Sequence, residues 1–240
     1  IDNYYLTTHP DEIRTTIHKK KLNYLPIPVD QNIENLKIYE YKNRYKDLFF
    51  ALSHGVNFGK LKKGKSDERE MFINQLMKLF PNIKYNILGI SNEPPKWNYN
   101  FYKELIKCKM SLNLSRGKPL KFTSSNRIAA LIGNGIFTFI DERTKFKHYF
   151  NENEVGFYKN LNDLGNKIEY MLSNPKKINE YGKNGFKDYI TFVTRELTSS
   201  KPSIYKDVFE KWSIGVNNVK PEESVQQVLA MLRMPSTEDQ

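Results

Sequence analysis

Apolar runs of strand length alternate with helix-length segments through this chain, and this alternation most constrains its fold. The runs cover residues 47–52, 85–90, 110–114 and 136–140, and most of them are apolar on both faces, as in strands buried inside a sheet. Helices are expected from the Ser66 cap to the stop at Pro81 and over 101–107, 126–132, 161–172 and 175–189. The pattern predicts an α/β fold, a doubly wound and Rossmann-like parallel sheet with helices on both faces.

The first 30 residues have a pattern of their own. Residues 4–8 are rich in strand formers, Pro10 with the acids after it is typical of a helix start, and 22–25 is a second short strand. Pro26 and Pro28 then require an extended chain. We therefore expect the last strand–helix–strand unit of one domain, followed by a linker to the next.

Composition limits the function classes. The chain has 240 residues, 39% of them hydrophobic, and no run approaches the ~18 apolar residues of a membrane span. The single cysteine, Cys108, excludes a disulfide framework, and a buried thiol is a better interpretation of it than a nucleophile. The net charge of +11 would attract nucleic acid or an anionic surface, but 30 of the 38 basic residues are lysines, which favours a solvated surface instead.

The placement of charge is more informative than its sum. Residues 105–140 contain no Asp or Glu, yet they hold six basic residues around the loop 115–125. Ser124 and Ser125 stand at the start of the helix expected at 126–132, where free N–H groups favour an anion. Such a cluster suits a phosphate or pyrophosphate. The alternative is a capping serine beside solvated lysines.

Two further loops follow expected strands. The first places His54 and Gly55 after the strand at 47–52, where a histidine can act as a general acid or base and glycine lets the backbone approach a phosphate. A structural histidine in a surface loop is the alternative. In the second, Trp97 could stack on a nucleobase, although a tryptophan that closes a core edge is the preferred interpretation. No histidine, cysteine or carboxylate spacing indicates a metal site.

From about Leu25 to Tyr189 the chain resembles glycosyltransferases of the GT-B fold. It is similar above all to the donor-binding C-terminal domain of the bacterial spore-maturation-type, or glycosyltransferase family 1, group. The order of the segments carries the resemblance, and no single segment does. They are LPIPVD (25–30), KMSLNLS (109–115), SNRI with GNG (125–135), FNENE with FY (150–158) and INEYGKNG (178–185).

The resemblance implies a division of the chain. Residues 1–25 would end an N-terminal acceptor domain that lies mostly outside this sequence, 26–46 would be the interdomain linker, and 47–195 the nucleotide-sugar-binding domain. Residues 196–216 would hold a helix that crosses back, while the acidic 217–240 is expected to be a tail of foreign origin or a native appendage. We expect a fragment of a cytoplasmic protein whose basic face suits acceptors held at the inner face of the membrane.

The resemblance also implies a donor site. The expected donor-binding residues are Gly55, Asn113, Ser115, Arg116, Lys121, Ser124, Ser125, Asn126 and Arg127, with His54 as the catalytic candidate. Neither a metal nor a cofactor is expected, because the nucleotide sugar is a substrate and cationic side chains can neutralise the leaving diphosphate. The expected partners are this donor and a glycan or lipid-linked acceptor, without nucleic acid.

One departure from the family pattern matters. Many retaining members have a glutamate that binds the donor ribose and another eight residues earlier, and Ala130 and Phe122 occupy those places here. Ribose recognition would then fall to another group such as Asn126, and retaining or inverting chemistry stays open. A basic nucleic-acid-binding module and a nucleotide-binding remnant without activity remain the alternatives.

Overall fold

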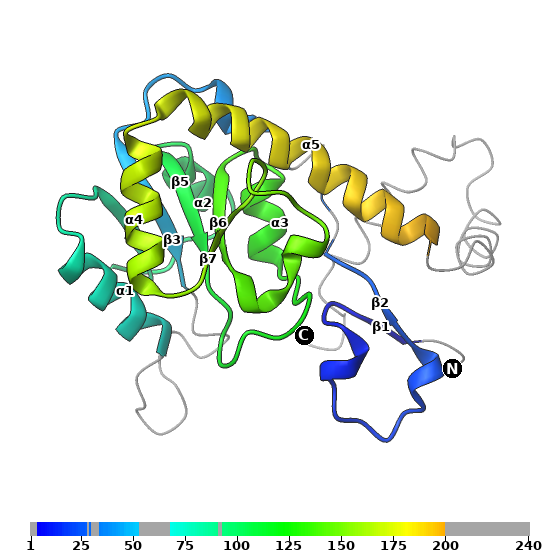
Figure 1. The fold of residues 1–240 in the computed structure, drawn as a ribbon. Coiled ribbons are helices and arrows are strands. Elements are labelled where there is room, and N and C mark those ends of the chain that lie inside the picture. The colour runs from blue at the N-terminus through cyan, green and yellow to red at the C-terminus, as the bar shows by residue number, and fades with distance from the viewer. Residues whose placement is uncertain (1–3, 28, 30–33, 53–67, 91–92, 200–240) are drawn as a thin grey trace.

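The computed structural model describes residues 4–27, 29, 34–52, 68–90 and 93–199, and its centre is a five-stranded parallel sheet (Figure 1). The strands run in the order β4-β3-β5-β6-β7. They are β3 (Lys46–Ala51), β4 (Tyr85–Leu88), β5 (Cys108–Asn113), β6 (Phe137–Asp141) and β7 (Gly156–Tyr158). The predicted doubly wound α/β fold is confirmed. The three-residue strand β7 was not predicted, because so short a run has no recognisable period.

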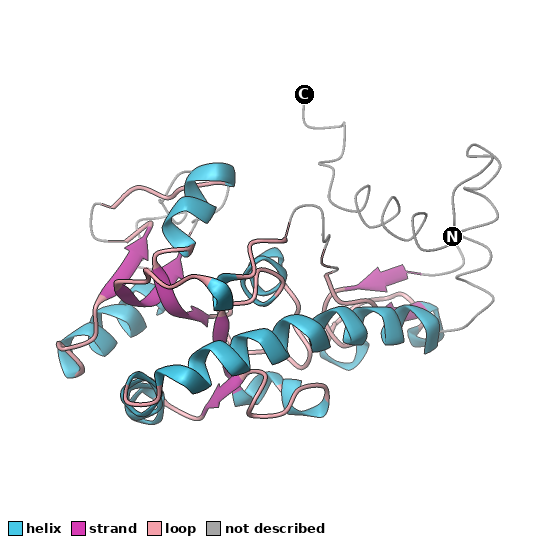
Figure 2. Ribbon diagram, turned by 90° about the horizontal axis from the view of Figure 1, so that it is seen from above, coloured by secondary structure: helices cyan, strands magenta, loops and turns pink. Residues whose placement is uncertain are grey.

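Helices cover both faces of this sheet (Figures 1 and 2). On one face, α1 (Glu68–Leu79) and α4 (Leu161–Leu172) share a buried cluster with alternate residues of β3. On the other, α2 (Asn98–Leu105) and α3 (Asn126–Ile132) pack against Phe49 and Ile136. The apolar strands are therefore buried from both sides, as their sequences predict.

The long helix α5 (Pro175–Ser199) passes unusually close to the sheet. A Cβ atom on Gly182 would lie 2.7 Å from the carbonyl oxygen of Gly135, and one on Gly185 would lie 2.4 Å from that of Glu154. Both glycines are needed because backbone atoms cannot move aside as a flexible side chain can. The helix also continues well beyond the predicted end at 189, through the expected domain boundary at 195.

The N-terminal segment contains two short parallel strands, β1 (Tyr4–Leu6) and β2 (Leu22–Tyr24), which lie beside the main sheet (Figure 1). The helix predicted between them is wrong. Only the single turns η1 (Pro10–Glu12) and η2 (Lys19–Lys21) form there. Residues 15–17 are all β-branched, and the N–H of Ile17 donates to the hydroxyl of Thr15, which competes with helical bonding.

The linker packs tightly on the sheet domain rather than spanning open solvent. Val29 and Ile38 are buried in two of its core clusters, and the short helix η3 (Ile38–Glu40) lies against α5. The predicted helix cap at Ser66, the loop that holds His54 and Gly55, the tail 217–240 and most of the segment expected to hold the crossing helix lie outside the described residues. The division into an acceptor-domain remnant and a donor domain stays a prediction.

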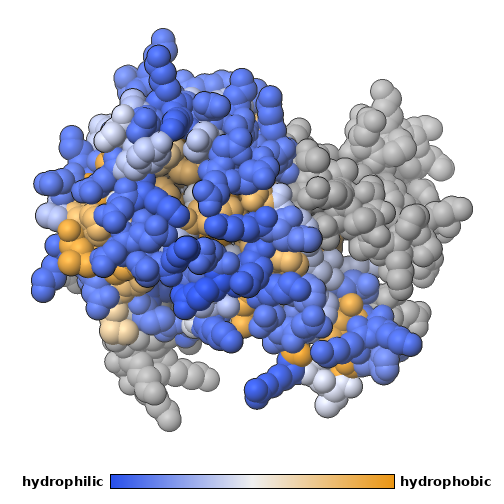
Figure 3. Space-filling view, in the orientation of Figure 1, coloured by the Kyte–Doolittle hydropathy of each residue, from blue (hydrophilic) through white to orange (hydrophobic). Residues whose placement is uncertain are grey.

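The visible surface is mostly hydrophilic, with apolar side chains in small separate groups (Figure 3). Among the described helices, none is both long enough and apolar enough to cross a bilayer.

Candidate functional site

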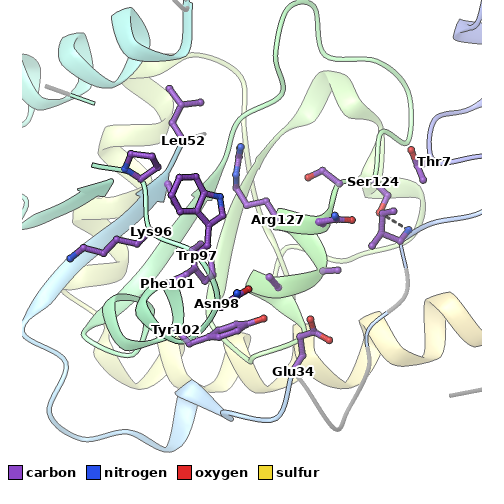
Figure 4. A pocket seen from close by; sticks show the side chains of 17 residues that line it. Thr7, Glu34, Leu52, Lys96, Trp97, Asn98, Phe101, Tyr102, Ser124 and Arg127 are labelled. Carbon is purple, nitrogen blue, oxygen red and sulfur yellow. Dashed lines mark hydrogen bonds between the residues drawn. The ribbon is translucent and has the colours of Figure 1, made fainter. Parts of the chain in front are cut away.

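A pocket of about 800 Å³ opens between the carboxyl end of β3 and the first turn of α3, the helix that follows β5. The chain runs from β3 to β4 on one side and then crosses back to β5 on the other, so the winding direction reverses between β3 and β5. Ligands of doubly wound sheets bind at this switch point. The pocket is lined by Thr7, Ile27 and Glu34, by Ala51 and Leu52, by 95–98 with Phe101 and Tyr102, and by 124–127 with Ala129 and Ala130 (Figure 4).

Arg127, one of the predicted donor-binding residues, lines this pocket and is held firmly. Its Nη1 donates a 2.9 Å hydrogen bond to the carbonyl of Leu114, and its guanidinium carbon lies 5.4 Å from the centre of the Phe50 ring. A guanidinium has five N–H donors, so it can bind an anion in addition to the Leu114 carbonyl. The pocket therefore contains a positioned cation.

The two predicted serines also line the pocket, but they differ in what they do. Ser125 caps α3, its Oγ accepting from the N–H of Ile128 at 3.4 Å. Ser124 is buried, and its Oγ accepts from the N–H of Ile27 at 2.9 Å and lies 3.3 Å from the hydroxyl of Tyr189. Ser124 thus joins the linker to α5 and positions the loop. Asn126, also in the lining, is exposed at the first position of α3.

The remaining residues of the basic loop lie outside this lining. Arg116 is exposed, Ser115 is half-buried, and neither borders the pocket. The ammonium of Lys121 lies 3.4 Å from Nε2 of His9 and 5.0 Å from the centre of the Phe122 ring, so it faces the N-terminal segment. The structure does not bring these three residues to the pocket, and their binding roles stay predictions.

Asn113, at the end of β5, is buried, and its Oδ1 has no hydrogen-bond partner among the described residues. Phe49 of β3 is paired with Ser111 of β5. Side chains two residues apart lie on the same face of a sheet, so Ala51 and Asn113, two residues further along, also share a face. Ala51 lines the pocket. A buried amide oxygen without a partner in this place is an acceptor that a ligand's donor could satisfy.

Phe122, which the resemblance places where many retaining glycosyltransferases have a glutamate, has an unusual backbone. Its φ is 55°, a left-handed conformation that is strained for a bulky residue. A cage of rings holds it there, with centroid distances of 4.7 Å to Tyr149, 5.5 Å to His9 and 5.7 Å to Tyr24. The N-terminal segment therefore fixes the loop that leads to Ser124 and α3.

Trp97 was expected to close a core edge, and that preferred interpretation is wrong. It is 52% exposed and lines the pocket, as do Phe101 and Tyr102 one turn later in α2. Pro94 and Pro95 stiffen the chain just before Trp97, which is itself extended and immediately precedes α2. The pocket therefore has an aromatic wall at the place where the nucleobase hypothesis needs one.

Glu34 is the pocket residue that sequence reasoning missed. It comes from the linker, is only 5% exposed, and lines the pocket with Tyr102 at the end away from Ser124 (Figure 4). No local pattern marks it, because its proximity to α3 depends on how the linker folds back. It is the acidic member of the described lining.

The other cation of the lining, Lys96, is paired with a carboxylate of the protein. The ammonium of Lys96 donates to Glu104 at 2.9 Å, and Lys107 donates to the same carboxylate at 2.7 Å. Burial acts to raise the pKa of Glu104, but the hydrogen bonds from Lys107, Lys96 and Asn86 outweigh it and hold that pKa at about 2. Lys96 thus has an acidic partner within the protein.

Three other predictions concern reactive groups. His54 and Gly55 lie outside the described residues. Cys108 is a buried free thiol as expected, and burial raises its pKa to about 12, far above that of a nucleophile. In the described part of the chain, no group of three or more His, Cys, Asp or Glu is placed to hold a metal ion.

Comparison with protein families agrees with this architecture. The model of a family described as glycosyl transferase-like matches residues 68–200, more than half of the chain. The match begins at α1 and ends one residue after α5, so it includes α2 and α3, which line the pocket. A search of curated proteins found no significant match. With this match over the sheet that carries the pocket, the chain belongs to the glycosyl transferase-like family.

Proposed function

We propose that the donor of this glycosyltransferase is a nucleoside-diphosphate sugar, bound in the pocket between the end of β3 and the start of α3. The observation that carries the proposal is the position of Arg127, a cation fixed at the switch point of the sheet and facing an aromatic wall. A nucleotide has the matching parts, an anionic diphosphate and a flat base. Tryptophan stacks on any base, so Trp97 does not decide which one is bound.

Arg127 would act on the leaving group. When the bond between the sugar and the diphosphate breaks, the electron pair stays on the diphosphate oxygen, and a fixed guanidinium stabilises that developing charge. The acceptor hydroxyl forms the new bond to the sugar and loses its proton to a base. Asn113, at the neighbouring strand end, offers an acceptor for a hydroxyl of the donor.

We further propose a glycan or lipid-linked acceptor and a role in the synthesis of cell-surface polysaccharide. This part rests on the resemblance to GT-B enzymes, in which the acceptor binds on the N-terminal domain. By itself this chain would then bind the donor without transferring the sugar, because its residues 1–25 are a small part of such a domain.

The test is a calorimetric titration of the chain with UDP and GDP. We expect one saturable site whose affinity falls about tenfold or more in Arg127→Ala, since hydrogen bonds to charged groups contribute about 1.5–3 kcal/mol. Arg127→Lys keeps the charge but loses the planar fork, and should lie between the two. Arg14→Ala is the matched control, because Arg14 is exposed and does not border the pocket.

A different pattern of binding would contradict the proposal. If neither nucleotide binds, while DNA binds with an affinity that falls steeply with the logarithm of salt concentration, the chain is a nucleic-acid-binding module and the proposal is wrong. Equal losses of affinity in Arg127→Ala and Arg14→Ala would show only a general effect of charge.

A further inference from the structure

Tyr189 joins two parts of the pocket wall, although it is not part of the lining itself. It is fully buried in α5, and its hydroxyl donates to the carbonyl of Ile27 at 2.8 Å. The same hydroxyl oxygen lies 3.3 Å from Oγ of Ser124. Ile27 and Ser124 both line the pocket. One side chain of α5 therefore contacts the linker and the loop before α3 at the same time.

These contacts form a closed ring of three hydrogen bonds. The N–H of Ile27 donates to Oγ of Ser124 at 2.9 Å. Because the hydrogen of the Tyr189 hydroxyl goes to the Ile27 carbonyl, the hydrogen of the Ser124 hydroxyl is left for the Tyr189 oxygen. Each hydroxyl is then a donor and an acceptor at once, and hydrogen bonds in such chains strengthen one another. Loss of either hydroxyl opens the ring.

The linker depends on this ring because it has few backbone donors here. Pro26 and Pro28 have no N–H, so Ile27 has the one backbone N–H of residues 26–28. The ring uses that N–H and the carbonyl of the same residue. Two side-chain hydroxyls therefore bind both backbone polar groups of Ile27 and fix its place at the pocket.

The tyrosine ring is itself held firmly. It stacks on Phe150 with a centroid distance of 5.9 Å and an angle of 12° between the ring planes. It also belongs to the buried cluster that contains Ile128 and Ile132 of α3. The hydroxyl is thus fixed relative to the helix that carries Arg127, and a fixed group loses little entropy when it holds its partners.

We propose that Tyr189 is a positioning residue of the donor pocket, whose hydroxyl keeps the linker and the loop before α3 in the arrangement that binds the nucleotide. The ring also reaches the N-terminal segment, because the N–H of Ser124 donates to the carbonyl of Thr7, another lining residue, at 2.7 Å. The inference rests on the proposed function, since the pocket that Tyr189 positions is the proposed donor site. Tyr189 acts through Ile27 and Ser124, without touching the ligand.

The test removes this one hydroxyl. Tyr189→Phe keeps the stacked ring and deletes only the oxygen. Exchange of the Ile27 amide hydrogen should become about fivefold faster, the size expected for the loss of about one hydrogen bond. The affinity for UDP or GDP, whichever binds the unmodified chain more tightly in calorimetry, should fall by about the same factor, because one side of the pocket is no longer held in place.

Tyr158→Phe is the matched control. Tyr158 is also buried, but its hydroxyl has no hydrogen-bond partner among the described residues, and its ring belongs to the cluster on the other face of the sheet. The loss of that hydroxyl should change neither the exchange of Ile27 nor the nucleotide affinity. Thermal unfolding of each variant checks that it folds.

A double variant tests the ring as a unit. Ser124→Ala removes the other hydroxyl of the same ring, so its effect and that of Tyr189→Phe should not be independent. In the protein with both changes, the fold-loss of nucleotide affinity should be smaller than the product of the two single losses.

Three results would overturn the inference. They are equal nucleotide affinity in Tyr189→Phe and the unmodified chain, an equal loss in Tyr158→Phe, and a double variant whose loss equals the product of the single losses. If neither UDP nor GDP binds the unmodified chain, the proposed function fails and the inference fails with it. If one of them binds, the variants decide the inference alone.

Discussion

At the scale of single residues, the side chains of the pocket differ in how far the protein already fixes them. Arg127 is held by a backbone carbonyl and a phenylalanine ring, and Ser124 by the linker and α5. Trp97, by contrast, exposes about half of its surface to solvent. A ligand can cover aromatic surface that is exposed at a pocket. We therefore expect ligand binding to change the environment of Trp97 more than that of Arg127 or Ser124.

We predict that Trp97→Ala weakens nucleotide binding by about tenfold, because stacking of a base on an aromatic ring contributes about 1–3 kcal/mol. Trp97→Phe should recover part of the loss. Calorimetry with UDP measures both variants. Pyrophosphate, which has no base, should bind the three proteins equally, and a loss of pyrophosphate binding in Trp97→Ala would show that the indole supports the pocket itself.

At the scale of elements, the end of α2 is tied to the sheet by one carboxylate. Glu104 in α2 accepts from Asn86 of β4 at 3.3 Å and from Lys96 and Lys107 on either side of the helix. Its side chain is 14% exposed, so solvent screens these bonds only partly. Because α2 also carries Phe101 and Tyr102, this tie positions part of the pocket wall.

The low pKa of Glu104 predicts a stability that depends on pH. The folded pKa is about 2, below the ordinary value of 4.5, so the ionised group stabilises the fold above pH 4.5 and this contribution is lost as the pH falls from 4.5 toward 2. Glu104→Gln should therefore lower the free energy of unfolding by about 2 kcal/mol at pH 7, and the difference should shrink below pH 4.5. Urea unfolding at pH 7, 4.5 and 3 measures it.

Glu180→Gln in the exposed face of α5 is the control for this experiment, since it changes a helical glutamate without removing a buried bond. It should shift the free energy of unfolding little at any pH. The assignment would be contradicted if the free energy of unfolding of Glu104→Gln differed from that of the unmodified chain by the same amount from pH 7 to pH 3.

At the scale of the whole molecule, the N-terminal segment and the sheet domain meet at the pocket. The N–H of Ser124 donates to the carbonyl of Thr7 at 2.7 Å, and the N–H of His9 donates to the carbonyl of Lys121 at 3.0 Å. The hydroxyl of Tyr189 donates to the carbonyl of Ile27 at 2.8 Å. Since Thr7 and Ile27 line the pocket, the docked segment forms one of its sides.

We predict that Phe122→Ala loosens this docking while leaving the sheet folded. The ring is the centre of the aromatic cage, and removal of a buried phenylalanine costs about 3–5 kcal/mol. Amide hydrogen exchange should become at least about tenfold faster in residues 4–27 and stay nearly unchanged in β5 and β6. Nucleotide affinity should fall as well, because one side of the pocket becomes mobile.

Phe80→Ala serves as the comparison. Phe80 packs on the opposite face, against Gly165 and the cluster under α1 and α4. Its loss should therefore destabilise the sheet without a preferential rise of amide exchange in residues 4–27. If Phe122→Ala raises exchange in β5 as much as in residues 4–27, the segment and the sheet form one cooperative unit and the prediction is wrong.

The sequence predicts the sheet well because its strands carry their own signal. Runs such as 48–52 and 136–140 are mostly apolar on both faces, and only a position between two layers of helices buries such residues. The helix predicted after Pro10 does not form. Its proline and the acids next to it are typical of a helix start, but the β-branched residues 15–17 oppose the continuation of a helix. Local signals of this kind compete, and here the β-branched residues prevail over the start signal.

By itself the sequence determined the α/β class, the stretch that holds Ser125 and Arg127, and the family resemblance, because these depend on periodicity and on residues that are near one another in the chain. Only the tertiary structure decided which side chains meet. It turned Lys121 toward His9, set Trp97 at the pocket and brought Glu34 there across some 90 residues from Arg127. Those contacts follow from how the linker and the N-terminal segment fold back on the sheet, and long-range packing of that kind leaves no period in the sequence.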